Sequence, residues 1–257
     1  MLQVITGHKE AFDQAKTISK IGEIILYTST GVALFTSYSE YFWEGFENIN
    51  EILNIINIVL IFLYVISELV VNSILPKAEL RRRLGYIDNS FDTNFSGKKS
   101  ENYYNNDKLN PGLIKLAANC FESSLFTFNI SKKMIWPLAT KNILVIIVFL
   151  LAAYIGDRKI LILISQLTLP IVLIQQLVKL CIYVNTNQLV LDNFRELFTE
   201  LRDHKEANKA PQIIRNIIHY ESNISWASII LDSNLYDKLN PSLSQEWENY
   251  KKEYNIV

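Results

Sequence analysis

The sequence predicts an all-α integral membrane protein. It has four transmembrane helices in two hairpins, a cytoplasmic helical insert between the hairpins and a cytoplasmic helical tail after them. Apolar residues are gathered in four blocks, each near the length of about 20 residues that a helix needs to cross about 30 Å of hydrocarbon. Charged residues, 20% of the chain, lie mostly between the blocks. The blocks are residues 21–42, 52–75, 136–155 and 160–184.

The four blocks differ in composition. The first is rich in Ser and Thr and carries Glu23 near its start, so an amphipathic surface helix is the alternative interpretation of it. Residues 53–75 and 142–156, which make up most of the second and third blocks, hold a single ionisable acid or base, Glu68. Pro170 in the fourth block is compatible with a membrane helix, because neighbouring groups can satisfy the freed carbonyl. The residues before the first block lack the pattern of a secretory signal.

Charge in the connecting segments predicts the orientation. Residues 39–51 contain four acidic residues and no Lys or Arg, whereas residues 77–83 and 132–141, at the two ends of the insert, are basic. Because Lys and Arg gather on the cytoplasmic side of membrane helices, we expect the insert and both termini to be cytoplasmic. Arg158 and Lys159 in the last tight turn oppose this assignment and are outnumbered.

The chain is therefore predicted to consist of five segments. They are a cytoplasmic lead (1–20), a transmembrane hairpin (21–75), a cytoplasmic insert (76–135), a second transmembrane hairpin (136–184) and a cytoplasmic helical tail (185–257).

The insert and the tail have their own predicted elements. Residues 91–112 are polar and contain Gly and Pro, which predicts a loop, and residues 112–134 are amphipathic, which predicts a helix. In the tail, residues 187–204 are predicted to extend the fourth span, a second helix to run from Pro211 to about Leu231, and a third to begin at Ser244. The first of these helices has an apolar face formed by Leu191, Phe194, Phe198 and Leu201.

No catalytic, metal or cofactor site is predicted. His8, His204 and His219 lie far apart, and none has a second His or Cys at ligand spacing. Asp88 and Asp92 are four residues apart and could share a helix face, but carboxylates at this spacing are usually solvated. The formal net charge of −1 gives no reason to expect a nucleic acid polymer as partner. We therefore expect a protein that is not an enzyme.

Polar residues form a stripe along two of the predicted spans. The members recur at intervals of mainly three and four residues, so each set lies on one side of its helix. The candidate site residues are Asn54, Asn57, Tyr64, Glu68 and Asn72 in the second span, and Ser165, Thr168, Gln175, Gln176 and Lys179 in the fourth. Two interpretations are open: the stripes are interhelical hydrogen-bonding groups, or they line a weakly selective water-filled path.

Glu68 and Lys179 are the two charged members of the stripes. A charged residue in hydrocarbon costs on the order of 2.5 to 3.5 kcal/mol, so neither is expected to face lipid. Their predicted depths allow them to meet. The alternative is that Lys179 reaches the inner headgroups and that Glu68 is protonated.

Three stretches resemble a known family. They are FDQAKTISKIG at residues 12–22, KAELRRRLGYIDNSFDTNF at residues 77–95, and the tail segment at residues 201–239. Together with the two hairpins and the basic stretch after the second span, they resemble the bacterial SMODS-associated four-transmembrane effector family. The resemblance covers nearly the whole chain but contains no short signature motif.

The resemblance implies a pore-forming or membrane-disrupting effector of a nucleotide-activated antiphage system in the bacterial inner membrane. It implies a homo-oligomer in the lipid bilayer, triggered by a cyclic nucleotide or a sensor protein acting on the cytoplasmic regions. Two other classes remain open. One is a non-catalytic membrane scaffold or regulatory subunit, and the other is a small transporter, for which Pro170 is the only hint.

Overall fold

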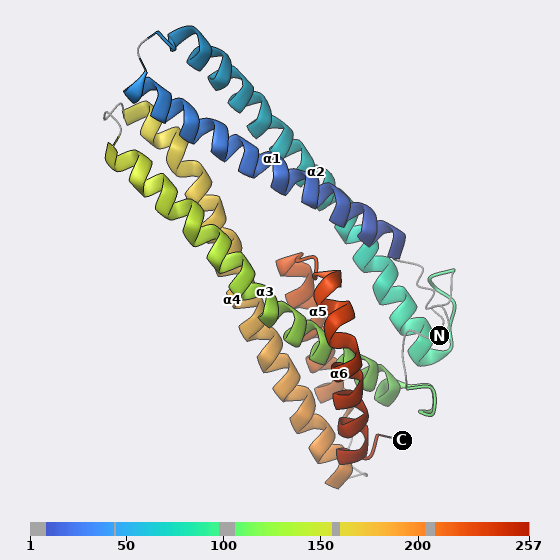
Figure 1. The fold of residues 1–257 in the computed structure, drawn as a ribbon. Helices are drawn as coiled ribbons and strands as arrows, with labels where there is room; N and C mark the ends of the chain where they lie inside the picture. The colour runs from blue at the N-terminus through green and yellow to red at the C-terminus, as the bar shows by residue number, and fades with distance from the viewer. Residues whose placement is uncertain (1–8, 44, 98–105, 156–159, 204–208, 257) are drawn as a thin grey trace. The chain divides into compact units, whose positions relative to one another are not determined.

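The computed structural model describes residues 9–43, 45–97, 106–155, 160–203 and 209–256, and these ranges form helices and their connections without a β-strand. The predicted all-α class is confirmed. The helices are α1 (Lys9–Phe42), α2 (Glu47–Phe91), α3 (Leu113–Ile155), α4 (Ile160–Asp203), α5 (Ala210–Ala227) and α6 (Ser233–Glu253) (Figure 1).

The helices divide into two compact units. The first, which we call the apolar unit, comprises residues 13–74 and 136–178. The second, which we call the insert–tail unit, comprises residues 1–12, 75–135 and 179–257. Because α1, α2, α3 and α4 each cross a unit boundary, four helices run without interruption from one unit into the other.

α2 and α3 each continue through an internal proline at a predicted span boundary. The sequence predicts a span that ends at Leu75 and another that starts at Trp136, but α2 contains Pro76 and α3 contains Pro137. An interior proline removes one backbone hydrogen bond and costs about 3 kcal/mol, so packing on both sides of the proline must offset this cost. Ala78, one turn beyond Leu75 and fully buried, provides such packing on α2.

The tail helices start as predicted except for the last one, and α5 ends at Ala227, before the predicted end near Leu231. α4 extends the fourth block without a break to Asp203, and α5 begins beside Pro211, as predicted. The predicted start of the last helix at Ser244 is wrong, because α6 begins at Ser233. The Asp232 side chain accepts hydrogen bonds from the first backbone amides of this helix, which makes it an N-cap.

The insert–tail unit has an aromatic core. Phe121 of α3 is fully buried among aromatic rings of α4 and α6, and Tyr220 of α5 bonds Thr127 of α3 at 3.1 Å. The buried rings around Phe121 belong to Phe194, Phe198, Trp247 and Tyr254. The predicted apolar face of residues 191–201 therefore lies in this core.

Two helices of the described chain contain a stretch long and apolar enough to cross a membrane. These stretches are 18-residue windows within residues 10–36 of α1 and within α2, and their mean hydropathies are 1.2 and 2.4. Only 22% and 17% of these two windows are buried, whereas the core helix of a soluble protein is mostly buried. The third and fourth predicted spans include residues 152–170, whose side chains lie outside the described part of the chain.

Candidate functional site

The apolar unit has a polar interior and an apolar exterior. Its buried side chains include many hydroxyl and amide groups, while its exposed side chains are mainly large and aliphatic. The buried polar residues are Ser29, Thr30, Thr36, Ser39, Asn50, Ser67 and Asn142. Exposed large apolar residues on α2 alone include Ile52, Ile55, Ile58, Val59, Phe62 and Leu69. Folding in water favours the opposite arrangement, since apolar surface is then removed from solvent.

Hydrogen bonds connect α1 and α2 along their length. Ser29 donates to Asn57 at 2.6 Å, and Ser39 donates to Asn50 at 2.6 Å. Residue numbers rise on α1 as they fall on α2, so the two helices form an antiparallel hairpin (Figure 1). At the other end, Gly22 approaches Ser67 so closely that an added Cβ at Gly22 would collide with the Ser67 hydroxyl. The first hairpin is thus joined by small and polar residues, as membrane helices commonly are.

Asn142 connects α1, α3 and α4. This amide is buried, donates to the backbone carbonyl of Leu173 at 2.9 Å, and accepts a hydrogen bond from the Tyr27 hydroxyl at 3.4 Å. Leu173 and Leu26 form a small apolar cluster beside it. One side chain therefore holds three helices of the apolar unit together.

The apolar unit also contains an interhelical ion pair. The Lys141 ammonium pairs with the Glu23 carboxylate and lies 3.9 Å from the centre of the Tyr27 ring, which adds a cation–π contact. Both charges belong to residues near the predicted cytoplasmic starts of the first and third spans. A membrane helix would keep such charges at its end or pair them.

Exchanging these charges tests the pair. We expect Lys141→Glu alone and Glu23→Lys alone each to lower the unfolding free energy in detergent by about 1 kcal/mol, because each places like charges together. The double exchange should recover most of the loss, and thermal melting of the purified chain measures all three. A double variant whose loss equals the sum of the single losses would show that the two residues do not interact.

The structure describes the side chains of eight of the ten predicted stripe residues. Asn57 bonds Ser29, and the Tyr64 hydroxyl interacts with the Gln176 side chain, so these polar groups join helices. Asn54, Asn72, Gln175 and Lys179 are exposed, and Glu68 is partly exposed. Ser165 and Thr168 belong to the part of α4 whose side chains are outside the described residues. The predicted Glu68–Lys179 pair stays a prediction.

Sequence reasoning missed the polar residues of α1 and α3. Ser29, Ser39 and Asn142 are central to the observed contacts, but none was part of a predicted stripe. The Ser- and Thr-rich composition of the first block was the available signal. That composition had only left a surface helix open as the alternative to a membrane span, whereas the structure places several of these hydroxyls in the interior.

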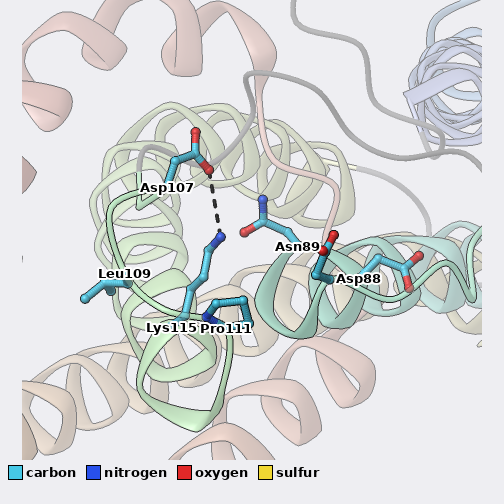
Figure 2. A pocket seen from close by; sticks show the side chains of 7 residues that line it. Asp88, Asn89, Asp107, Leu109, Pro111 and Lys115 are labelled. Atoms are coloured by element: carbon cyan, nitrogen blue, oxygen red, sulfur yellow. Dashed lines mark ion pairs between the residues drawn. The ribbon is translucent and has the colours of Figure 1, made fainter.

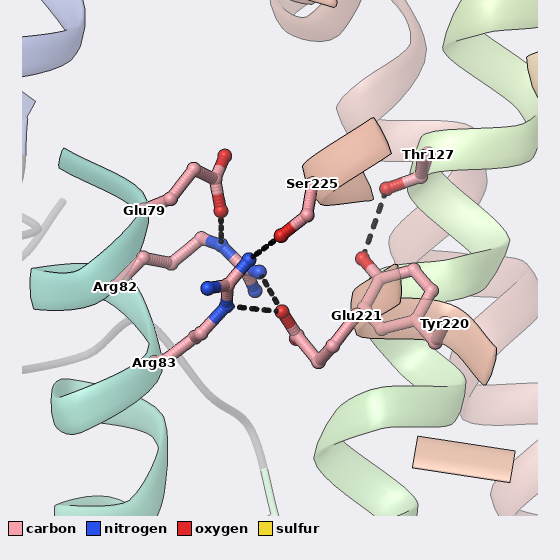
Figure 3. Close-up of polar contacts among 7 residues, drawn as sticks. All are labelled: Glu79, Arg82, Arg83, Thr127, Tyr220, Glu221 and Ser225. Carbon is pink, nitrogen blue, oxygen red and sulfur yellow. Dashed lines mark hydrogen bonds and ion pairs between the residues drawn. The ribbon is translucent and has the colours of Figure 1, made fainter. Parts of the chain in front are cut away.

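An ion cluster joins α2 to α5 in the insert–tail unit (Figure 3). The Glu221 carboxylate oxygen Oε2 accepts hydrogen bonds from Arg82 at 2.6 Å and Arg83 at 2.8 Å. Arg82 also bonds Glu79 at 2.9 Å, and Arg83 donates to Ser225. Burial would lower the pKa of Arg82, but the carboxylates of Glu221 and Glu79 hold it well above the ordinary value. The basic stretch after the second span therefore has a specific partner in the tail.

The other predicted polar candidates have structural roles or lie outside the description. Asp88 and Asp92 do not share a helix face, because α2 ends at Phe91 and Asp92 adopts a left-handed conformation with φ 54°. Within the described ranges, no group of three His, Cys, Asp or Glu residues could hold a metal ion. His219 lies on α5, while His8 and His204 are outside the described residues.

Comparisons with known proteins identify no relative. No family model, no curated protein and no solved structure matches this chain.

Proposed function

We propose that this chain is a four-span protein of the bacterial cell membrane with cytoplasmic termini. In this proposal, several copies assemble a polar pore that depolarises the cell, as a non-catalytic effector. The observation that carries it is the inverted polarity of the apolar unit, whose hydroxyl and amide groups are inside while Ile, Leu, Val and Phe are outside. Lipid is the solvent in which that arrangement is stable, because backbone and side-chain polar groups are satisfied internally.

Exposed amides on the apolar exterior support assembly into a pore. Asn54 and Asn72 on α2 are eighteen residues apart, which is five helical turns, so they lie on the same side of the helix. Gln175 on α4 is exposed as well. An amide facing lipid alone is unfavourable, and contact with a second copy or with water in a shared channel removes this cost.

The ion pair near the helix ends supports the proposed orientation. Glu23 lies close to the start of the first span, and Lys141 lies close to the start of the third. Two spans that both enter from the cytoplasm bring these residues to one level of the membrane, and their pairing agrees with that arrangement.

The insert–tail unit supplies a place for a trigger to act. It is a compact unit with its own aromatic core, and four helices run uninterrupted between it and the apolar unit. We infer that a cyclic nucleotide or a sensor protein bound to this unit would change the packing of the spans through these continuous helices. In each of α2, α3 and α4, an apolar segment continues into a more polar segment of the insert–tail unit, which supports this assignment.

Depolarisation of cells tests the proposal. We expect strong expression in bacteria, together with the trigger when known, to collapse the membrane potential reported by a voltage-sensitive dye. The triple variant Asn54→Leu, Asn72→Leu, Gln175→Leu should keep its membrane abundance and lose at least nine-tenths of the depolarisation, because it removes the exposed amides. Ile58→Leu with Val65→Leu, on the same helix, is the matched control and should behave as wild type.

A membrane scaffold is the second candidate, favoured by the interhelical hydrogen bonds of Asn57 and Asn142. Leakage of liposomes and the membrane potential of expressing cells distinguish the two functions. If the reconstituted chain leaves dye-loaded liposomes intact and its expression leaves the cell potential unchanged, the pore proposal fails and the scaffold is favoured.

A further inference from the structure

A small polar pocket lies between the end of α2 and the start of α3, entirely within the insert–tail unit (Figure 2). Its volume is about 330 Å³, near the lower end of the range for small-molecule sites. The lining residues are Asp88, Asn89, Asp92, Asp107, Leu109, Pro111 and Lys115. The pocket is far smaller than a protein interface and large enough for a monosaccharide or a nucleoside.

One wall of the pocket is fixed by Asp88. Its buried carboxylate accepts hydrogen bonds from Thr93, Phe95 and Ser96, with both the amide and the hydroxyl of Ser96 as donors. Burial would raise the pKa of Asp88, but the hydrogen bonds from Ser96, Phe95 and Thr93 lower it to about 2. Asp88 is therefore ionised, and its oxygens already accept hydrogen bonds from the neighbouring turn. It shapes the pocket and repels anions.

A second wall is held by a buried amide network. Asn119 donates to the Asn89 carbonyl oxygen at 2.9 Å and accepts from Asn106 at 2.9 Å, and Trp247 of α6 donates to Asn106 at 3.3 Å. The network engages the oxygen of Asn89. In the described part of the chain, its amide nitrogen donates no hydrogen bond, and Figure 2 shows the Asn89 side chain directed toward the pocket. Asn89 thus offers the pocket a donor.

Lys115 offers a second donor from the opposite side. Nine-tenths of its side chain is buried, and its ammonium lies 3.9 Å from the Asp107 carboxylate. That separation is too long for a hydrogen bond. A hydroxyl group placed between the two would accept from Lys115 and donate to Asp107, because a hydroxyl is both donor and acceptor. A water molecule has the same capacity and is the alternative occupant.

The net charge of the lining residues limits the kinds of ligand that the pocket can bind. Three carboxylates face one ammonium in the lining, so the pocket is net negative and unfavourable for a phosphate. Leu109 and Pro111 give it an apolar edge against which the C–H face of a sugar ring can pack. From this combination of two donors, acidic acceptors and an apolar edge, we propose that the pocket binds an uncharged molecule with adjacent hydroxyls. Such a molecule is a free sugar or the ribose of a nucleoside.

Ligand-binding measurements on the full chain test this site. The protein is purified in an amine-oxide detergent, which has no sugar headgroup, and titrated with ribose, adenosine and 2′,3′-dideoxyadenosine by calorimetry or saturation-transfer NMR. We expect saturable binding of ribose or adenosine and none of the dideoxy compound, which lacks both hydroxyls. Much tighter binding of adenosine than of ribose identifies a nucleoside site, and similar affinities identify a sugar site.

Two variants locate the binding in the pocket. Lys115→Met keeps the buried stem, and Asn89→Asp keeps the oxygen that accepts from Asn119 while removing the donor. Each should weaken binding about tenfold, the effect of one lost hydrogen bond. Lys108→Met, an exposed neighbour that is not in the lining, should bind as wild type. Trp247 fluorescence, which reports the buried network, confirms that each variant is folded.

Three outcomes would overturn the proposal. One is the absence of saturable binding for both ribose and adenosine, which leaves water as the only occupant. The second is equal affinity in wild type and Lys115→Met. The third is displacement of the bound sugar by inorganic phosphate, which the net negative lining should exclude. None of these results depends on whether the protein forms a pore.

Discussion

Replacing Glu221 by Ala is expected to lower the unfolding free energy of the insert–tail unit by about 3 kcal/mol. The Glu221 carboxylate is the shared acceptor of Arg82 and Arg83, and 84% of its side chain is buried, since its relative exposure is 16%. Removing it leaves the mostly buried Arg82 guanidinium with Glu79 as its remaining carboxylate partner. Breaking a buried pair is more costly than the pair is worth, because one charge stays desolvated.

The measurement uses the single buried tryptophan of the unit. Trp247 is fully buried, whereas Trp43, Trp136 and Trp226 are 45%, 75% and 54% exposed. Replacing these three by Phe leaves Trp247 as the only fluorescence reporter, and urea titration of the full chain in detergent then gives the stability of this unit.

A surface ion pair provides the matched control. Glu248 pairs with Lys251 one turn later on α6, and nearly half of the Glu248 side chain is exposed. Glu248→Ala should change the unfolding free energy by no more than about 0.5 kcal/mol. If Glu221→Ala and Glu248→Ala have the same small effect, the cluster between α2 and α5 contributes nothing to stability.

Local pattern was sufficient to predict the helices. The apolar blocks, the Pro at the start of α5 and the spacing of Leu191, Phe194 and Phe198 each reflect interactions within one turn or one face of a helix. The ends of elements were predicted less well. α2 passes Pro76, and α6 starts eleven residues before the predicted Ser244, because buried contacts made by distant parts of the chain stabilise these segments.

The partners of charged residues could not be predicted from local pattern. Arg82 and Arg83 were interpreted as an orientation signal, yet they bond Glu221, more than a hundred residues away in the chain. Lys141 and Glu23 are also more than a hundred residues apart in the sequence. Periodicity specifies the face on which a residue lies, but the partner on another helix is specified by the packing of the two helices.

The polar pocket is the clearest example of this limit. Asn89, Asp107 and Lys115 belong to the end of α2, the connection and the start of α3, and no spacing rule joins them. Residues 91–112 were predicted to be a loop because of their Gly, Pro and Asn content. That composition is compatible with a turn such as the one Asp88 holds, but it does not reveal that the turn borders a pocket.

Truncating Phe121 to Ala should lower the unfolding free energy of the insert–tail unit by about 3 to 5 kcal/mol. Its ring is fully buried and stacks on Phe194 at 5.9 Å and Phe198 at 5.4 Å, and it meets Trp247 edge-on at 5.3 Å. These neighbours come from α4 and α6, so the truncated side chain leaves a cavity at the junction of three helices. Trp247 is held from the other side by Asn106, which limits how far it can move to fill the space.

The same urea titration measures the loss, and two variants show whether it comes from packing. Phe121→Leu keeps most of the apolar volume and should cost less than half as much as Phe121→Ala, because the cavity is smaller. Phe95→Ala removes a ring that is 66% exposed and should stay within about 0.5 kcal/mol of wild type. A Phe121→Ala protein that unfolds at the same urea concentration as Phe95→Ala would mean that the aromatic cluster is not the core of the unit. A loss near 4 kcal/mol would instead make this cluster the element that holds α3, α4 and α6 together.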